Sequence, residues 1–177
     1  MEDEILHGRE KYTTIIDGSG VLVDPHGLDR AELVRLAHAR EMISHFDTSK
    51  LSKDGFRVLI DETDVKLPSG EVVANGMTFR NTYHLRGQAQ CFVPCGGRPE
   101  AVDISNVHQL IVDGKSKFAY IVEGANLYVS KEFKANGSFI TQEAKLRLEK
   151  AGAIVYKDAS ANKGGVTSSS LEGTQPS

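Results

Sequence analysis

Short apolar runs alternate along this chain with segments of helical periodicity. The segment 31–46 carries apolar residues near helical spacing after Asp29, and 141–152 does so between Thr141 and Gly152. Asp and Thr are good helix N-caps, and glycine is the usual residue just after a helix. Five other runs are rich in β-branched or aromatic residues and predict strands, at 12–17, 56–60, 91–93, 118–122 and 153–156. This alternation predicts an α/β domain with a doubly wound sheet.

The connecting segments hold further elements. The apolar positions of 102–112 predict another helix, and 81–90 reads as a loop or a short helix. The segment 61–81 is rich in turn residues, with Pro68, Ser69 and Gly70 between two β-type runs. We therefore expect a hairpin there, inserted on the α/β frame.

Three of the predicted strands end in small or polar residues. The run at 91–93 leads into Pro94-Cys95-Gly96-Gly97, the run at 118–122 into Glu123-Gly124-Ala125-Asn126, and the last strand into Asn162-Lys163-Gly164-Gly165. Glycines let the backbone turn sharply and let a ligand come close. Open α/β sheets bind ligands at the carboxyl ends of their strands. The pattern predicts a parallel sheet with a ligand across that edge.

Asp17 follows the first predicted strand and precedes the turn Gly18-Ser19-Gly20. An acidic residue at the tip of the second strand of a dinucleotide-binding unit accepts hydrogen bonds from ribose hydroxyls. The alternative is that Asp17 only caps a turn, which aspartate commonly does. Local sequence leaves both interpretations open.

Composition narrows the possible partners. With 40% hydrophobic and 25% charged residues, the chain of 177 residues has the composition of a folded domain. The net charge of −3 and the absence of a basic cluster argue against a nucleic-acid partner. No apolar run approaches the roughly 20 residues of a membrane span. We expect Cys91 and Cys95 to be ordinary reduced cysteines and expect no metal site.

Several motifs together closely resemble the large NAD-specific glutamate dehydrogenases of fungi. They are the segments 18–22, 56–62, 92–99, 120–126 and 157–170, and they occur in the order found in that family. The resemblance covers nearly the whole chain.

The resemblance implies the roles of particular residues, with NAD as the cofactor. Ser169 matches the serine that contacts the far carboxylate of glutamate, and no catalytic residue or metal ligand is matched. The matched cofactor-binding residues are Asp17 on the adenosine ribose, Pro94, Cys95 and Gly96 alongside the cofactor, Glu123, Gly124, Ala125 and Asn126 near the nicotinamide riboside, and Asn162 beside the carboxamide.

The resemblance also implies that 1–177 is a partial dinucleotide-binding domain with a Rossmann-like, mainly parallel sheet. No Gly-x-Gly-x-x-Gly occurs before Tyr12, so we expect the first strand and the glycine-rich loop to be missing. The family's catalytic lysine and aspartate lie in an upstream domain that has no counterpart here. The segment 128–138 is an atypical loop, because family members pass almost directly across this position.

The expected function is therefore the NAD-binding portion of a glutamate dehydrogenase, in amino-acid catabolism. The full enzyme would convert L-glutamate and NAD to 2-oxoglutarate, ammonia and NADH as a homo-oligomer, without a nucleic-acid or membrane partner. We expect this chain to be inactive alone and to reside in the cytoplasm, or alternatively in mitochondria. The other interpretations are a non-catalytic interaction fragment or a truncated gene-model product.

Overall fold

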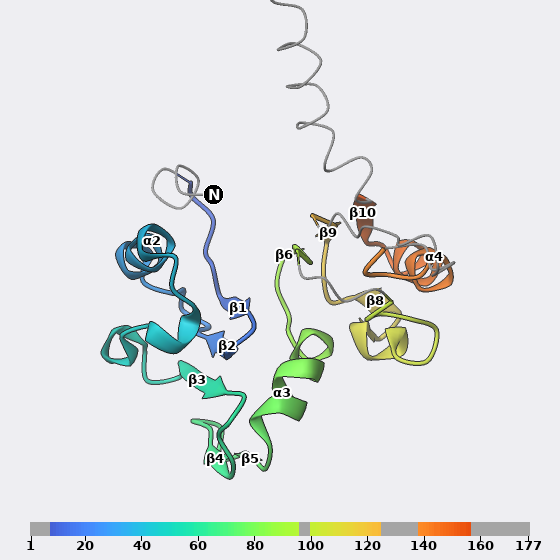
Figure 1. Ribbon diagram of the computed structural model, residues 1–177. Coiled ribbons are helices and arrows are strands. Elements are labelled where there is room, and N and C mark those ends of the chain that lie inside the picture. Colours follow the sequence, from blue (N-terminus) through green and yellow to red (C-terminus); the bar gives the residue numbers. More distant parts are fainter. Residues whose placement is uncertain (1–7, 96–99, 125–137, 157–177) are drawn as a thin grey trace, which may run out of the picture. The chain divides into compact units, whose positions relative to one another are not determined.

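The computed structural model describes residues 8–95, 100–124 and 138–156 (Figure 1). The chain divides into two compact units, Met1–Gly87 and Gln88–Ser177. Each unit has its own three-stranded sheet.

The sheet of the first unit is antiparallel. Its strands are β1 (Thr14–Ile16), β2 (Gly20–Val23) and β3 (Phe56–Leu59), in the order β1-β2-β3. Strands β1 and β3 were predicted, whereas β2 was not among the predicted strands and lies between the other two. The turn after β1, closed by the Asp17 N–H donating to the Gly20 carbonyl at 3.2 Å, reverses the chain and places β2 there.

The central strand β2 is buried along its whole length. Because side chains alternate along a strand, it packs against a different core on each face of the sheet. Leu22 faces one core and Val21 the other, and both are fully buried. The Leu22 core is closed by Leu28, Leu33, Leu36, Ile43 and Phe46, and the Val21 core contains Val23, Val58, Leu67, Val73 and Phe79.

Helix α2 (Arg30–Ala39) begins where predicted and ends earlier. The Asp29 side chain caps it by accepting from the Glu32 N–H at 2.8 Å. Arg40 then takes a left-handed φ of 54° and ends the helix, so the prediction of one helix over 31–46 was wrong. The 3-10 helix Ile43–His45 follows and buries Ile43 in the same core, which explains why the apolar pattern continues past the helix end.

The predicted hairpin region contains both a hairpin and the start of a helix. Strands β4 (Val65–Lys66) and β5 (Val72–Val73) pair antiparallel across the Pro68–Gly70 turn. Helix α3 (Gly76–Thr82) then begins before residue 81, capped by Asn75, whose side chain accepts from the Thr78 N–H at 2.8 Å. Two more 3-10 helices in this unit are Thr48–Lys50 and Tyr83–Leu85.

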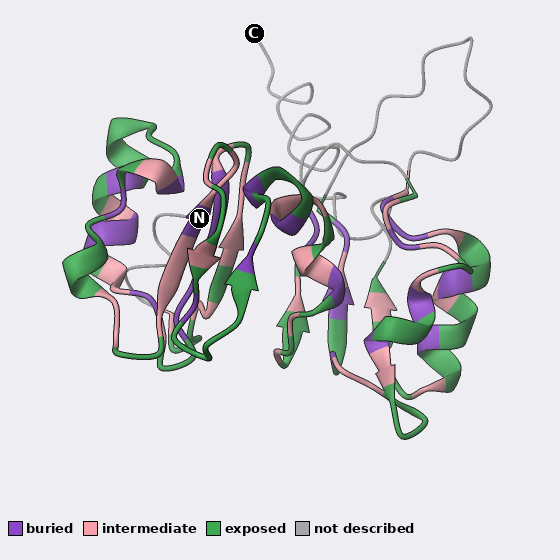
Figure 2. Ribbon diagram, turned by 90° about the horizontal axis from the view of Figure 1, so that it is seen from below, coloured by how far each residue is buried: buried purple, intermediate pink, exposed green. Residues whose placement is uncertain are grey.

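The sheet of the second unit is parallel, as predicted. Strands β6 (Cys91–Phe92), β9 (Tyr120–Val122) and β10 (Ile154–Tyr156) lie in the order β10-β9-β6. Helix α4 (Gln142–Lys150) leads into β10, buries Ala144 and Leu148, and exposes its opposite side (Figure 2). Thr141 caps this helix as expected, by accepting from the Ala144 N–H at 3.3 Å.

The helix predicted over 102–112 does not form. Asp103 accepts from the Ser105 and Asn106 N–H groups, and this side-chain turn competes with a helix. Val102 instead forms a bridge with Ile140. The rest of the segment is the 3-10 helix Val107–Leu110 and a hairpin of β7 (Ile111–Val112) and β8 (Lys115–Ser116), whose turn residues Asp113 and Gly114 have φ values of 50° and 74°.

Glu32 forms a buried ionic cluster in the first unit. Its side chain is 4% exposed and pairs with Arg35 at 2.7 Å and Lys50 at 3.4 Å, while the Asp47 N–H donates to it at 3.1 Å. The Arg35 hydrogen bonds lower the pKa of Glu32 from 4.5 to about 2, against the opposing effect of burial.

We expect this cluster to make stability depend on pH. A carboxylate with a lowered folded-state pKa stabilises fully above its unfolded value, and loses that contribution as pH falls from about 4.5 through about 2. Because Arg35 is half exposed, we expect a contribution of about 2 kcal/mol at pH 7. Urea unfolding should show that the difference in free energy of unfolding between wild type and Glu32→Gln decreases as the pH falls over this range. A difference that stays constant down to pH 2 would contradict the assignment.

Candidate functional site

The carboxyl ends of the three parallel strands lie together. The Gly124 N–H donates to the Pro94 carbonyl at 3.1 Å, which joins the end of β9 to the chain after β6. The Glu123 N–H donates to the Tyr156 carbonyl at 2.9 Å, which joins β9 to β10. Pro94, Glu123 and Gly124 were all predicted site residues, and the structure places them at this one edge.

Gly124 and Cys95 are packed so closely that a side chain at 124 would force Cys95 to move. A Cβ atom on Gly124 would lie 2.8 Å from the Cys95 Sγ. Cys95 is itself an exposed free thiol. The absence of a side chain at 124 therefore lets the Cys95 Sγ lie directly against the backbone at the end of β9.

The side chain of Glu123 turns into the protein. Glu123 is 1% exposed, and its carboxylate accepts from the Ser138 Oγ at 2.8 and 3.0 Å and from the Ile140 N–H at 2.9 Å. All three bonds are within the second unit. The carboxylate predicted to lie near a ligand is thus already engaged by protein donors.

Asp17 lies in the first unit and caps a turn there. Its Oδ1 accepts from the Ser19 N–H at 2.8 Å and the Ser19 Oγ at 2.7 Å, and its Oδ2 accepts from the Ile43 N–H at 2.9 Å. A carboxylate offers about four acceptor positions, so Oδ2 keeps capacity for one more donor. Of the two interpretations of Asp17, the capped turn is present, and it leaves room for a ligand hydroxyl.

Arg80 fixes the backbone of the same turn. Its Nε donates to the Asp17 carbonyl at 2.7 Å, and its Nη1 donates to the Asn81 Oδ1 at 3.2 Å. Sequence reasoning missed Arg80, because it lies 63 positions from Asp17 and no local motif marks it. It also missed Ser138 and Ile140 as the partners of Glu123, for the same reason.

The remaining predicted residues lie outside the described part of the chain. These are Gly96, Ala125, Asn126, Asn162 and Ser169, together with 128–137 of the atypical loop. Their assignments stay predictions.

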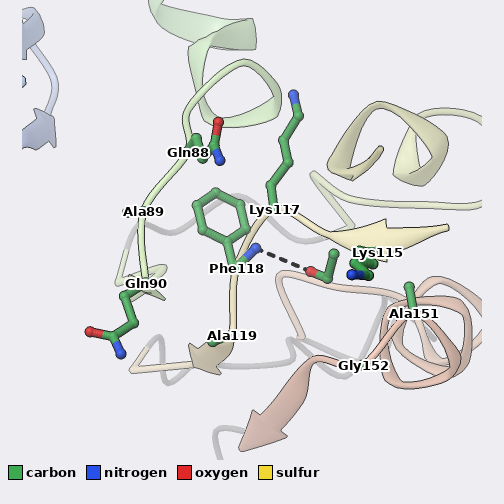
Figure 3. Close-up of a pocket in the computed structure, with 10 residues that line it drawn as sticks. Gln88, Ala89, Gln90, Lys115, Lys117, Phe118, Ala119, Ala151 and Gly152 are labelled. Atoms are coloured by element: carbon green, nitrogen blue, oxygen red, sulfur yellow. Dashed lines mark hydrogen bonds between the residues drawn. The ribbon is translucent and has the colours of Figure 1, made fainter. Parts of the chain in front are cut away.

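A hollow of about 690 Å³ lies at the opposite, amino end of the parallel sheet (Figure 3). Gln90, Ala119 and Gly152, each one or two positions before a strand, line it with Lys115, Lys117 and Phe118. No predicted site residue lines this hollow. It is therefore separate from the edge at which Gly124 meets Pro94.

Residues 8–95, 100–124 and 138–156 contain neither a cluster of metal-binding side chains nor a membrane-spanning helix. In these ranges no group of three or more His, Cys, Asp or Glu residues could hold a metal ion. No helix within them has both the length and the apolar character needed to cross a membrane.

Comparisons of this chain with known proteins agree on one family. The family model for glutamate/leucine/phenylalanine/valine dehydrogenase matches residues 3–177. The NAD-specific glutamate dehydrogenase of Neurospora crassa is 67% identical over 172 residues, covering 96% of this chain and 15% of that protein. The NAD-specific glutamate dehydrogenase of Saccharomyces cerevisiae is 56% identical over 170 residues, covering 92% of this chain and 15% of that protein.

A solved structure shows the same fold at lower identity. The glutamate dehydrogenase of Plasmodium falciparum has a TM-score of 0.58 and 20% sequence identity, over 97% of this chain and 29% of that one. This chain thus spans about 15% of the length of the curated relatives it matches.

Proposed function

Because this chain belongs to the glutamate/leucine/phenylalanine/valine dehydrogenase family, we propose that it is the NAD-binding part of an NAD-dependent glutamate dehydrogenase. The whole enzyme would convert L-glutamate and NAD to 2-oxoglutarate, ammonia and NADH. The observation that carries the proposal is the joined edge at Pro94, Glu123 and Gly124, where a glycine backbone lies among the carboxyl ends of parallel strands.

Each unit carries one described group that suits a part of such a cofactor. At the strand edge, the backbone at Gly124 is free of a side chain and held against Cys95, so it suits close contact with a planar group. At Asp17, the remaining acceptor position on Oδ2 suits one ribose hydroxyl. The negative charge of Asp17 would repel a 2′-phosphate and favour NAD over NADP.

This chain would contribute by orienting the two reactants. Bound NAD supplies the chemistry of hydride acceptance. The strand edge would fix the position of the nicotinamide end, Asn162 would hold its carboxamide, and Ser169 would hold the far carboxylate of glutamate. Orientation of this kind can supply several kcal/mol of barrier lowering. Because no residue of this chain matches the family's catalytic lysine or aspartate, we propose that it is inactive alone.

We also propose a doubly wound sheet for the complete cofactor domain. Within the described residues, β1 and β6 are terminal strands of their sheets, so each has a side on which another strand can pair. We propose that residues 1–177 lack the first strand of this sheet and its glycine-rich phosphate loop. A helix N-terminus after such a loop supplies the main phosphate donors.

The proposal is tested by calorimetric titration of the purified chain with NAD and NADP. We expect saturable NAD binding, with NADP at least about ten-fold weaker, equivalent to about 1.4 kcal/mol. In Asp17→Asn the preference for NAD over NADP should be smaller, because the negative charge is lost while the side chain can still cap the turn. Equal binding of both cofactors by wild type would refute the role of Asp17. A folded chain that binds neither would refute the proposal that 1–177 binds NAD by itself.

A second candidate function is docking to the full-length enzyme as a non-catalytic fragment. The terminal strands of the parallel sheet, β6 and β10, favour it, because open strand edges can pair with another chain. Co-purification of the tagged chain with intact enzyme would support docking. A chain that remains monomeric and is not retained by the enzyme would remove this candidate.

A further inference from the structure

Glu123 is a buried carboxylate at the end of the central strand β9. Its partners among the described residues are neutral donors, the Ser138 hydroxyl and the Ile140 N–H. A buried carboxylate is costly to leave without its hydrogen bonds, so these contacts hold the two chain segments firmly together.

The bonds of Glu123 connect parts of the second unit that are distant in sequence. Ser138 lies fifteen positions from Glu123, and Ile140 lies seventeen positions from it. Ile140 also bridges Val102, and the Thr141 N–H donates to the Val102 carbonyl at 2.9 Å. Since Thr141 caps α4, the carboxylate ties the end of β9 to the start of that helix.

The backbone next to Glu123 forms the candidate edge. Its own N–H bonds the Tyr156 carbonyl, and the following Gly124 N–H bonds the Pro94 carbonyl. A shift of the Glu123 side chain toward a ligand would break its hydrogen bonds to the Ser138 hydroxyl and the Ile140 N–H, and so release the end of β9 from the segment before α4. The carboxylate and the edge therefore depend on each other.

We propose that Glu123 is a positioning residue and not a cofactor contact. Its carboxylate, held by Ser138 and Ile140, keeps the Gly124 N–H on the Pro94 carbonyl, and so keeps the edge in the shape that binds the nicotinamide half of NAD. The effect on cofactor affinity rests on the proposed function, whereas the effect on the backbone at Gly124 does not.

The test compares Glu123→Ala, Glu123→Gln and Ser138→Ala in the complete chain, with two readouts. The first is hydrogen exchange of the Gly124 amide, and the second is the Kd for NAD by calorimetry. Ser105→Ala is the matched control, because it removes a hydroxyl-to-carboxylate bond of 2.5 Å to Asp103 in the same unit.

We expect Gly124 exchange to accelerate about ten-fold in Glu123→Ala and about three-fold in Ser138→Ala, with parallel losses of NAD affinity. Glu123→Gln should stay close to wild type, because its amide oxygen can accept from Ile140 and its amide nitrogen can donate to Ser138. Ser105→Ala should leave both readouts unchanged.

Direct contact with the cofactor would give a different pattern. Ser138→Ala would then bind NAD like wild type, and Glu123→Gln would lose affinity while Gly124 exchange stayed unchanged. That result would overturn the proposal. If wild type binds no NAD, the proposed function fails, and the exchange at Gly124 still decides whether Glu123 positions this backbone. If Glu123→Ala does not fold, Ser138→Ala decides.

Discussion

Replacing Gly76 with alanine is expected to destabilise the first unit by at least about 3 kcal/mol, close to the total stability of many small units. A Cβ atom at position 76 would lie 1.8 Å from the Leu59 carbonyl oxygen and 3.0 Å from the Glu62 carbonyl oxygen. Both neighbours are backbone atoms, so no side-chain rotation relieves the overlap. The Gly76 N–H also bonds the Glu62 carbonyl at 2.9 Å, which holds the chain at this distance.

Thermal and urea unfolding, followed by circular dichroism, measure the effect. Gly87→Ala is the control in the same unit, because the nearest atom to its added Cβ would be the Tyr83 carbonyl oxygen at 3.9 Å. We expect that variant to unfold within about 1 kcal/mol of wild type. If the two variants have equal stability, the close approach of α3 to the end of β3 is not present in solution.

Gly124→Ala is expected to weaken NAD binding by at least about ten-fold, or about 1.4 kcal/mol. The new Cβ would lie 2.8 Å from the Cys95 Sγ, closer than such atoms pack. Relief requires either rotation of the Cys95 side chain or separation of the two strand ends. Both outcomes change the edge at which we place the cofactor, and calorimetric titration with NAD detects them.

The double variant Cys95→Ala/Gly124→Ala identifies the cause. Removing the sulfur leaves the space that the new methyl group needs, so we expect affinity to return to within about three-fold of wild type. Cys95→Ala alone should have little effect. Additive losses in the double variant would mean that the backbone freedom of Gly124, and not its contact with Cys95, supports binding.

The sequence was most informative where several local signals agreed. The three runs that ended in glycine and polar residues formed the parallel sheet, because short buried apolar strands leave few other arrangements. Helix α4 formed between Thr141 and Gly152 because a capping hydroxyl and a C-terminal glycine marked both ends.

It was misleading where side-chain hydrogen bonds or tertiary contacts decided the structure. The apolar spacing of 102–112 predicted a helix, but Asp103 forms a local turn, and Ile111 and Val112 form the first strand of a hairpin whose turn is Asp113-Gly114. The position of β2 between β1 and β3 depends on strand pairing over tens of residues, which a local pattern does not contain.

Part of the candidate site was likewise predictable from local sequence signals, and part of it depends on tertiary contacts. The positions of Pro94, Glu123 and Gly124 at one edge follow from strand ends, and the sequence predicted them together. The direction of the Glu123 side chain depends on Ser138, which belongs to the atypical loop 128–138. Motif matching therefore identified the strand end that carries Glu123, and it could not show which atoms the carboxylate binds.

The bond between Glu123 and Ser138 also bears on how this part of the molecule can evolve. It joins the end of a strand to the approach of the next helix, whatever the number of residues between them. The free-energy cost of closing a loop, which is entropic, rises slowly, by about 0.6 kcal/mol for each doubling of the loop's length. Insertions and deletions between Glu123 and Ile140 should therefore be tolerated in natural lineages, whereas changes at Glu123 itself should be selected against.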